Sequence, residues 1–136
     1  MAKMKRVLLT SLMALMAFSP AAASAACRIS DFAGTWQVYT TAVSGTNIFW
    51  ARCKISINAS GVIADSICSL STGQNVGFVD GVVQAISAAD CSFRVIATIG
   101  GTRHSASHVT LARDSLTAKG VGKAGTANFV IDIVKI

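Results

Sequence analysis

Apolar and polar residues alternate in short stretches along the chain from residue 36 to its last residue. The clearest case is Cys53-Lys-Ile55-Ser-Ile57, followed by the turn sequence Asn58-Ala-Ser-Gly61 and a second alternating stretch. A period of two is typical of a half-buried strand, and Asn and Gly favour a tight turn. The pattern predicts a β-hairpin with one cysteine on each strand. If Ile57 pairs with Val62, Cys68 lies one diagonal step from Cys53 on the same face.

The same alternation predicts eight strands in total, joined by loops of hairpin length that are rich in Ser, Thr and Gly. The expected strands cover residues 36–40, 48–57, 62–68, 76–86, 91–99, 105–112, 116–121 and 127–136, and residues 41–47 are expected to form a loop. Many β-branched residues and the lack of an amphipathic helical pattern support an all-β fold. Eight antiparallel strands in sequence order indicate a small up-and-down β-barrel, because closure removes exposed strand edges. A two-sheet β-sandwich is the alternative.

Residues 1–25 carry the three parts of a secretory signal peptide. Lys3, Lys5 and Arg6 form a positive region, residues 7–18 are apolar, and Ala23-Ser24-Ala25 fits the small-residue cleavage rule. Twelve apolar residues are too few to cross a bilayer, which needs about 20. We therefore expect a signal peptide over 1–25, a single domain over 26–136, and no transmembrane segment.

Without the signal peptide, nine Lys and Arg stand against six Asp and no Glu, a net charge of +3. These cations are not clustered, so we expect no nucleic-acid partner. All four cysteines, Cys27, Cys53, Cys68 and Cys91, belong to the exported part, which predicts two disulfides of open connectivity in a periplasmic or secreted protein. A lipid anchor on Cys27, from a loose likeness of Ser24-Ala-Ala-Cys27 to a lipoprotein signal, is the alternative.

No residue pattern indicates catalysis or metal binding. His104 and His108 are the two histidines, and in a strand their separation of about 13 Å prevents them from sharing a metal. Val109 and Leu111 have the opposite parity, so both histidines are expected to face solvent. The Asp residues are scattered, and no serine lies in a nucleophile-elbow context. We expect a protein that is not an enzyme and that needs no cofactor.

The outer side of the predicted hairpin is the first candidate for binding. If Cys53, Ile55 and Ile57 face inward, Trp50, Arg52 and Lys54 face outward, and Trp and Arg are favoured in interaction hot spots. Alternatively, Trp50 covers the end of the barrel.

A second candidate is the series Arg103, Ser105 and Ser107, which shares its parity with Val109 and Leu111. If that parity faces inward, one mouth of the barrel is polar and can orient a small ligand. Fraying at the sheet edge is the alternative.

The opening Phe32-Ala-Gly34-Thr-Trp36 resembles the Gly-x-Trp start of the calycin superfamily, which includes lipocalins and avidins. More narrowly, Gly34-Thr-Trp36-Gln-Val38, then Cys53-Lys-Ile55-Ser-Ile57 and Cys68, is similar to the small bacterial metalloprotease inhibitors of that superfamily. The resemblance implies that Trp36 closes one end of the barrel and that an early hairpin carries a disulfide. It also implies inhibition of a protease, although Cys27 and Cys91 have no counterpart in that family.

Together these patterns predict an exported binding protein whose partner is another exported or periplasmic protein, proteases included. A binder of small molecules that uses the barrel interior, as lipocalins do, is the main alternative. A structural surface component is the third hypothesis.

Overall fold

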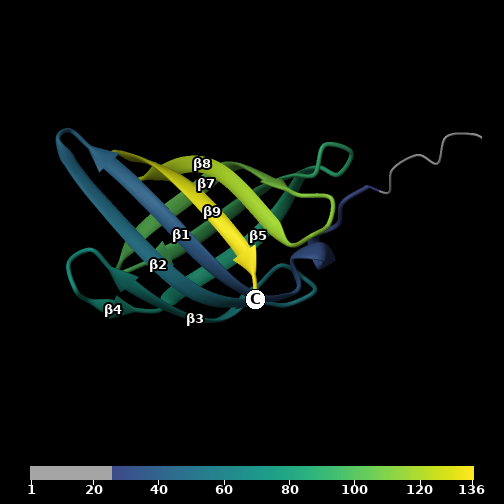
Figure 1. Ribbon diagram of the computed structural model, residues 1–136, viewed down its shortest axis with the longest axis horizontal. Helices are drawn as coiled ribbons and strands as arrows, with labels where there is room; N and C mark the ends of the chain where they lie inside the picture. Colours follow the sequence, from purple (N-terminus) through teal and green to yellow (C-terminus); the bar gives the residue numbers. More distant parts are fainter. Residues whose placement is uncertain (1–25) are drawn as a thin grey trace, which may run out of the picture.

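The computed structural model describes residues 26–136 and, within that range, all side chains except those of residues 78 and 79. The described chain forms a 3-10 helix and nine strands (Figure 1). Their bounds are η1 (Ile29–Phe32), β1 (Gly34–Ser44), β2 (Asn47–Ile57), β3 (Ile63–Leu70), β4 (Asn75–Val76), β5 (Phe78–Ser87), β6 (Ser92–Ile99), β7 (Thr102–Leu111), β8 (Thr117–Ala124) and β9 (Ala127–Lys135). The predicted signal peptide and its cleavage site lie outside the described residues.

All nine strands within 26–136 belong to one antiparallel sheet in the order β4-β3-β2-β1-β9-β8-β7-β6-β5. Strands that follow one another in the chain are neighbours in the sheet, except for β4 and β5, which form its two edges. The pairing of β1 with β9 joins strands that are far apart in sequence. The sheet curls until β3 approaches β5, which makes an incompletely closed barrel (Figure 1). The predicted up-and-down barrel is confirmed, and the eight long strands match the predicted eight. The β-sandwich alternative is wrong, since the strands form one sheet.

The seam between β3 and β5 is held at few points. An isolated bridge joins Val62 to Val82, and the Val83 N–H donates to the Gly61 carbonyl at 2.8 Å. Ile63 packs over Gly81, where an added Cβ would lie 2.5 Å from the end of the Ile63 side chain. A glycine in this strand therefore allows the two sheet edges to approach closely.

The β2–β3 hairpin is paired differently from the sequence-based register. Ile57 lies opposite Ile63, and a bulge in β3 at this point places Cys53 directly opposite Cys68. These two cysteines form a disulfide, and Cys27 pairs with Cys91. Both disulfides are therefore confirmed, and two of them indicate an oxidising compartment outside the cytosol. A lipid on the Cys27 sulfur is incompatible with this pairing.

Residues 41–44, predicted to belong to a loop, extend β1 instead. The β1–β2 connection is a two-residue turn at Gly45 and Thr46, and Gly45 adopts a φ of +60°. Thr and Val are common in strands, and pairing with both β2 and β9 overrides the loop-like composition. The resulting two strands of eleven residues each form the longest hairpin of the described chain.

One end of the barrel is closed by η1 and a group of aromatic rings. The rings of Phe32 and Phe93 meet edge to face at 4.8 Å, and the Trp36 Nε1–H donates to the Phe32 carbonyl at 2.6 Å. Lys135 lies 4.9 Å from the centre of the Trp36 ring and donates to the Asp31 carbonyl at 3.3 Å. Phe32, Trp36 and Phe93 have no exposed surface, so the closed end contributes the largest fully buried rings of the core.

Candidate functional site

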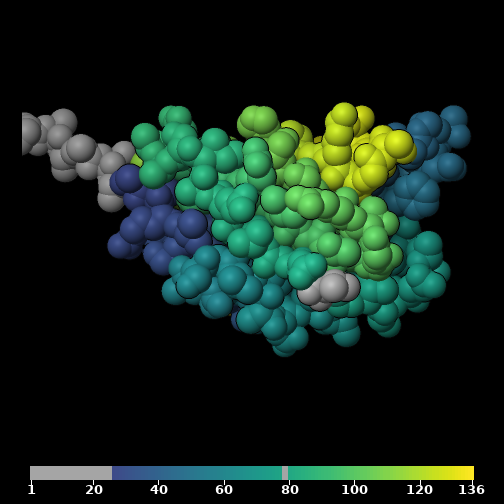
Figure 2. Space-filling model, turned by 180° about the vertical axis from the view of Figure 1, so that it is seen from behind, coloured from purple at the N-terminus to yellow at the C-terminus, as the bar shows by residue number. Residues whose placement is uncertain are grey.

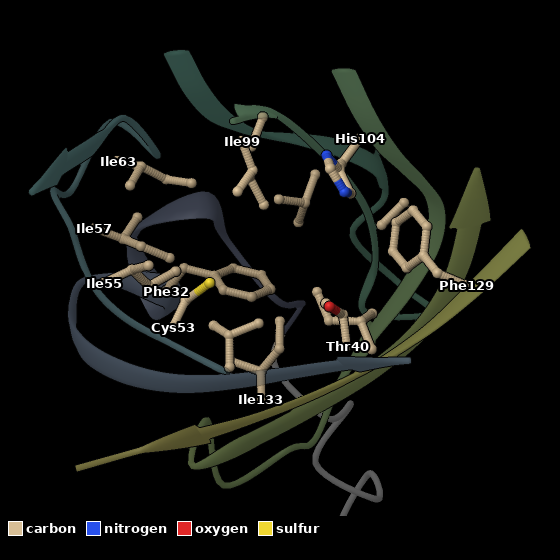
Figure 3. A pocket seen from close by; sticks show the side chains of 15 residues that line it. Phe32, Thr40, Cys53, Ile55, Ile57, Ile63, Ile99, His104, Phe129 and Ile133 are labelled. Atoms are coloured by element: carbon tan, nitrogen blue, oxygen red, sulfur yellow. The ribbon is translucent and has the colours of Figure 1, made fainter. Parts of the chain in front are cut away.

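An apolar cavity lies inside the barrel, above the aromatic rings of the closed end. Its volume is about 40 Å³. Its lining residues come from η1, from the β2–β3 hairpin and from β1, β6, β7 and β9: Phe32, Val38, Thr40, Cys53, Ile55, Ile57, Ile63, Val95, Ala97, Ile99, His104, Ala106, Phe129, Ile131 and Ile133 (Figure 3). Only Thr40 and His104 in this lining carry a polar side chain. Because the rest of the lining is apolar, the cavity favours an apolar group.

A wider hollow of about 430 Å³ forms the mouth at the opposite end from η1. The mouth and the inner cavity share Thr40, Ile99 and His104, so the two spaces adjoin at these residues. The rest of the mouth is lined by the ends of hairpins: Ala42, Ser44, Phe49, Trp50, Ala51, Leu70, Ser71, Thr72, Gln74, Gly100, Thr102, Ala124, Gly125, Thr126 and Ala127. A volume of this size falls in the usual range for small-molecule sites, about 300–1,000 Å³.

His104 turns toward the interior because of a bulge in β7. Ala106 pairs with Gly122 but His108 pairs with Val121, so one extra residue changes the side-chain parity between them. His104 and Ala106 therefore share the inner face with Val109 and Leu111, while His108 is exposed. The expectation that both histidines face solvent is wrong for His104.

The His104 ring is oriented by two contacts. Its Nδ1 lies 2.9 Å from the Thr102 carbonyl, and because a carbonyl only accepts, Nδ1 carries the proton. Nε2 is then the ring's second polar atom, which accepts a hydrogen bond when the ring is neutral and donates one when it is charged. The ring also packs at 5.8 Å from that of Phe129. Figure 3 shows Thr40 and His104 reaching the cavity from different walls of the barrel.

Two glycines of β8 allow the tight curvature that brings β7 and β9 around the cavity. A Cβ on Gly122 would collide with the Ser105 carbonyl and lie 2.8 Å from the Phe129 ring. A Cβ on Gly120 would collide with the His108 carbonyl and approach Val109. The sheet can bend here because these two positions have no side chain.

Trp50, Arg52 and Lys54 lie on β2, and all three are exposed, as an inward-facing Cys53 requires. Trp50 is 51 % exposed and also contributes to the wall of the mouth. The three residues lie along the outer side of one strand. Their role in binding stays a prediction.

Arg103, Ser105 and Ser107 are not brought together at the mouth. The bulge gives His104 and Ala106 the inward positions, so the parity that would have made these residues line the mouth does not hold. Ser107 instead lines a shallow depression on the outer face beside Val121 and Val130. Arg103 is exposed near the β6–β7 turn.

Thr40 and His104 are the polar residues that sequence reasoning did not select. Thr40 carries a signal, since it shares the strand parity of Trp36 and Val38. His104 carries none, because a bulge leaves no mark in a pattern of apolar and polar residues. Among the described residues, no group of three His, Cys, Asp or Glu side chains lies close enough to hold a metal ion.

Comparison with known proteins identifies the fold. No protein-family model matches the chain, and no curated protein matches it. Two solved structures are similar, and both are β-barrels of designed sequence. A de novo designed fluorescence-activating β-barrel aligns with a TM-score of 0.61 and 14 % identity over 76 % of this chain and 93 % of the designed one. A redesigned β-barrel aligns with a TM-score of 0.60 and 19 % identity over 83 % of this chain and 99 % of the other.

At these identities the likeness concerns the fold alone, and it supports the barrel architecture. Within the described residues, no helix is long and apolar enough to cross a membrane.

Proposed function

We propose that this protein is an exported, non-enzymatic binding protein that takes up a small amphipathic molecule through the mouth of its barrel. The observation that carries the proposal is the junction of the two spaces, where an apolar cavity adjoins a wider mouth at Thr40 and His104. An apolar chain enters the inner cavity and is stabilised by burial, about 0.8 kcal/mol for each CH₂ group. The polar head group lies in the wider mouth, where polar groups of the lining, Thr40 and His104 among them, exchange hydrogen bonds with it.

The dimensions of the interior restrict the ligand. About 40 Å³ accommodates the end of a narrow chain, whereas a fused ring system fits only the wider mouth. In a straight-chain alcohol such as 1-decanol, the end of the chain fits the inner cavity and the remaining chain lies in the mouth. Its hydroxyl can both donate to and accept from polar groups of the mouth lining. One of the similar solved barrels is described as fluorescence-activating, which suggests a fluorescent reporter for binding.

The test is displacement of a solvent-sensitive naphthalene fluorophore by 1-decanol, in the wild type and in two variants. Ala124 is half-buried in the mouth and lies opposite His104 in the β7–β8 pairing, so Ala124→Phe fills the entrance. Ala64 is exposed and lines neither space, so Ala64→Phe adds the same ring without blocking. We expect decanol-sensitive fluorescence in the wild type and Ala64→Phe, and at least tenfold weaker binding in Ala124→Phe, because the ring occupies the mouth. Equal binding by all three proteins would refute uptake through the mouth.

A protein partner such as a protease is the other hypothesis that the sequence raised. The exposed Trp50 and Arg52 support it, but the N-terminal segment gives it no support. Residues 26–30 are held against the barrel, since Cys27 is bonded to Cys91 and its N–H donates to the Ala88 carbonyl at 3.0 Å. A segment fixed in this way cannot extend from the barrel to enter the active site of a protease. The relation to the calycin superfamily remains a hypothesis, supported by the position of Trp36 beneath η1.

A further inference from the structure

The β1–β2 hairpin exposes large apolar side chains where it reaches the mouth. Ile48, Phe49 and Trp50 are consecutive, and they are 67 %, 45 % and 51 % exposed. Consecutive residues of a strand point to opposite faces, so neither face of this tip is covered by the rest of the barrel. Figure 2 shows the hairpin, in blue, projecting at the edge of the molecule. Val43, paired with Ile48, adds a further side chain that is 47 % exposed.

Charge is distributed unequally between the two ends of the barrel. The chain segments that form the mouth, residues 42–50, 69–76, 98–104 and 121–128, contain Arg103 and Lys123 and no acidic residue. Four of the six Asp residues lie at the other end, in η1 or beside the turns there. They are Asp31, Asp65, Asp90 and Asp114. Exposed Asp80 lies near the mouth as well, since it is the third residue of β5 and Phe78 pairs with Ile99 of the mouth lining. With Arg103 and Lys123 the rim therefore keeps a small net positive charge, whereas four of the six Asp residues lie at the other end.

We propose that the mouth docks on the surface of an anionic lipid bilayer, with Ile48, Phe49 and Trp50 inserted among the lipid head groups. Aromatic side chains favour this interface because one part of the ring system is apolar and Trp has a polar N–H. Arg103 and Lys123, on two other hairpins of the rim, contact lipid phosphates. Each such cation strengthens binding about fivefold, which corresponds to about 1 kcal/mol.

Two other occupants fit the rim less well. A second copy of this chain would bring two positive rims together, which opposes association. A protein partner needs a broad complementary patch, about 800 Å² on each side of a stable interface. The apolar residues here lie instead on the narrow tip of a projecting hairpin, which suits insertion of about 5–10 Å into a bilayer surface. This docking does not depend on ligand uptake, although it would present the mouth to the lipid phase.

The experiment measures co-sedimentation of residues 26–136 with vesicles of phosphatidylcholine, with and without roughly one-third phosphatidylglycerol. We expect binding to the anionic vesicles, weakened by salt, and much weaker binding to the neutral ones. A second readout uses the two tryptophans, because Trp36 is fully buried and Trp50 is exposed. Lipids brominated on their acyl chains should quench the emission of Trp50.

Paired variants distinguish insertion of the hairpin tip from non-specific adsorption of the protein to vesicles. Phe49→Ser/Trp50→Ser should lower the affinity for anionic vesicles at least tenfold by removing the inserted rings. Ile67→Ser/Ile86→Ser removes two apolar residues of similar exposure from β3 and β5 and should leave the affinity unchanged. Arg103→Gln/Lys123→Gln should lower the affinity about 25-fold. Its control, Lys54→Gln/Arg94→Gln, removes two exposed cations away from the rim and should change it less than threefold.

Absence of binding to anionic vesicles would overturn the proposal. So would equal losses in the rim variants and their controls, or Trp50 emission that brominated lipids do not quench. Decanol displacement in vesicle-free solution tests ligand uptake separately, so either proposal can fail without the other.

Discussion

The two ends of the barrel differ in how far their side chains are buried and hydrogen-bonded. At the closed end, η1 is fastened by the Cys27–Cys91 disulfide, and the Trp36 indole is hydrogen-bonded and covered by Lys135. At the mouth, the β1–β2 hairpin exposes Phe49 and Trp50. The same sheet thus ends in a packed core on one side and in an open mouth of mixed polar and apolar lining on the other.

This difference leads us to expect that the closed end determines stability and that the mouth carries the proposed binding. Residues that fill the closed end have no exposed surface, so their replacement changes the free energy of unfolding. Residues of the mouth, apart from buried Ile99, are half-buried or exposed, so their replacement is expected to change what the barrel can hold. The following predictions test this separation, beginning with the largest expected effect.

Trp36→Ala should lower the free energy of unfolding by about 3–5 kcal/mol, because it removes a fully buried ring and leaves a cavity. Trp50→Ala, at the exposed tip, should lower it by less than about 0.5 kcal/mol. Urea denaturation monitored by far-UV circular dichroism measures both. Comparable losses in the two variants would contradict the division between the ends.

Removing the disulfide of the closed end should lower the free energy of unfolding by an amount similar to that expected for Trp36→Ala. Cys27→Ser/Cys91→Ser should lower the free energy of unfolding by about 4 kcal/mol, because the bond closes a loop with a sequence separation of 64. Cys53→Ser/Cys68→Ser, with a separation of 15, should cost about 3 kcal/mol. Denaturation of both variants without reductant provides the comparison, and a larger loss for the second pair would contradict the loop-length argument.

Gly122→Ala should destabilise the barrel by about 1–3 kcal/mol, since the added Cβ collides with the β7 backbone and the Phe129 ring. Gly125→Ala provides the matched control. No atom lies within 4 Å of its Cβ position, and its φ is +59°, so only the backbone strain of about 1 kcal/mol applies. Thermal unfolding of both variants distinguishes crowding from strain, and the account expects the larger loss at Gly122.

The smallest expected effect is a change in ligand affinity at the junction of the mouth and the inner cavity. His104→Phe keeps a ring beside Phe129 but removes both ring nitrogens, and it should weaken 1-decanol binding about fivefold through loss of one hydrogen bond. His108→Phe changes an exposed histidine on the same strand and should leave binding unchanged. Isothermal titration calorimetry measures the affinities, and equal affinity in both variants would remove His104 from the proposed site.

Much of this fold follows from the period of two in the sequence. Cys53, Ile55 and Ile57 are buried as their alternation predicts, and the turn residues mark most of the strand ends. The site does not follow from the same pattern, because the β7 bulge reverses parity between Ala106 and His108. A bulge is decided by the packing of a curved sheet around Gly120 and Gly122, and this packing involves strands that the local sequence does not specify.

The register of the β2–β3 hairpin is a second feature that the local sequence does not specify. Local turn chemistry at Asn58 and Gly61 favours a tight hairpin, and the Asn58 side chain does accept hydrogen bonds from the Ser60 and Val62 N–H groups, both at 3.0 Å. Ile57 pairs with Ile63, one residue later than expected, and the bulge beside Ile57 shifts the pairing by one further residue, so that Cys53 meets Cys68. The cysteine pairing therefore depends on a detail that lies beyond the turn itself.

The central claim, that the barrel interior receives an apolar chain, is tested most directly by methyl NMR of the ¹³C-labelled protein during titration with 1-decanol. The account predicts saturable shifts for the methyl groups of Val95, Ile99 and Ile133, which line the inner cavity. Methyl groups of Ile67 and Val134, which are exposed on the outside, should not move. Shifts confined to the outer residues, or no saturable shift at any methyl group, would contradict the claim.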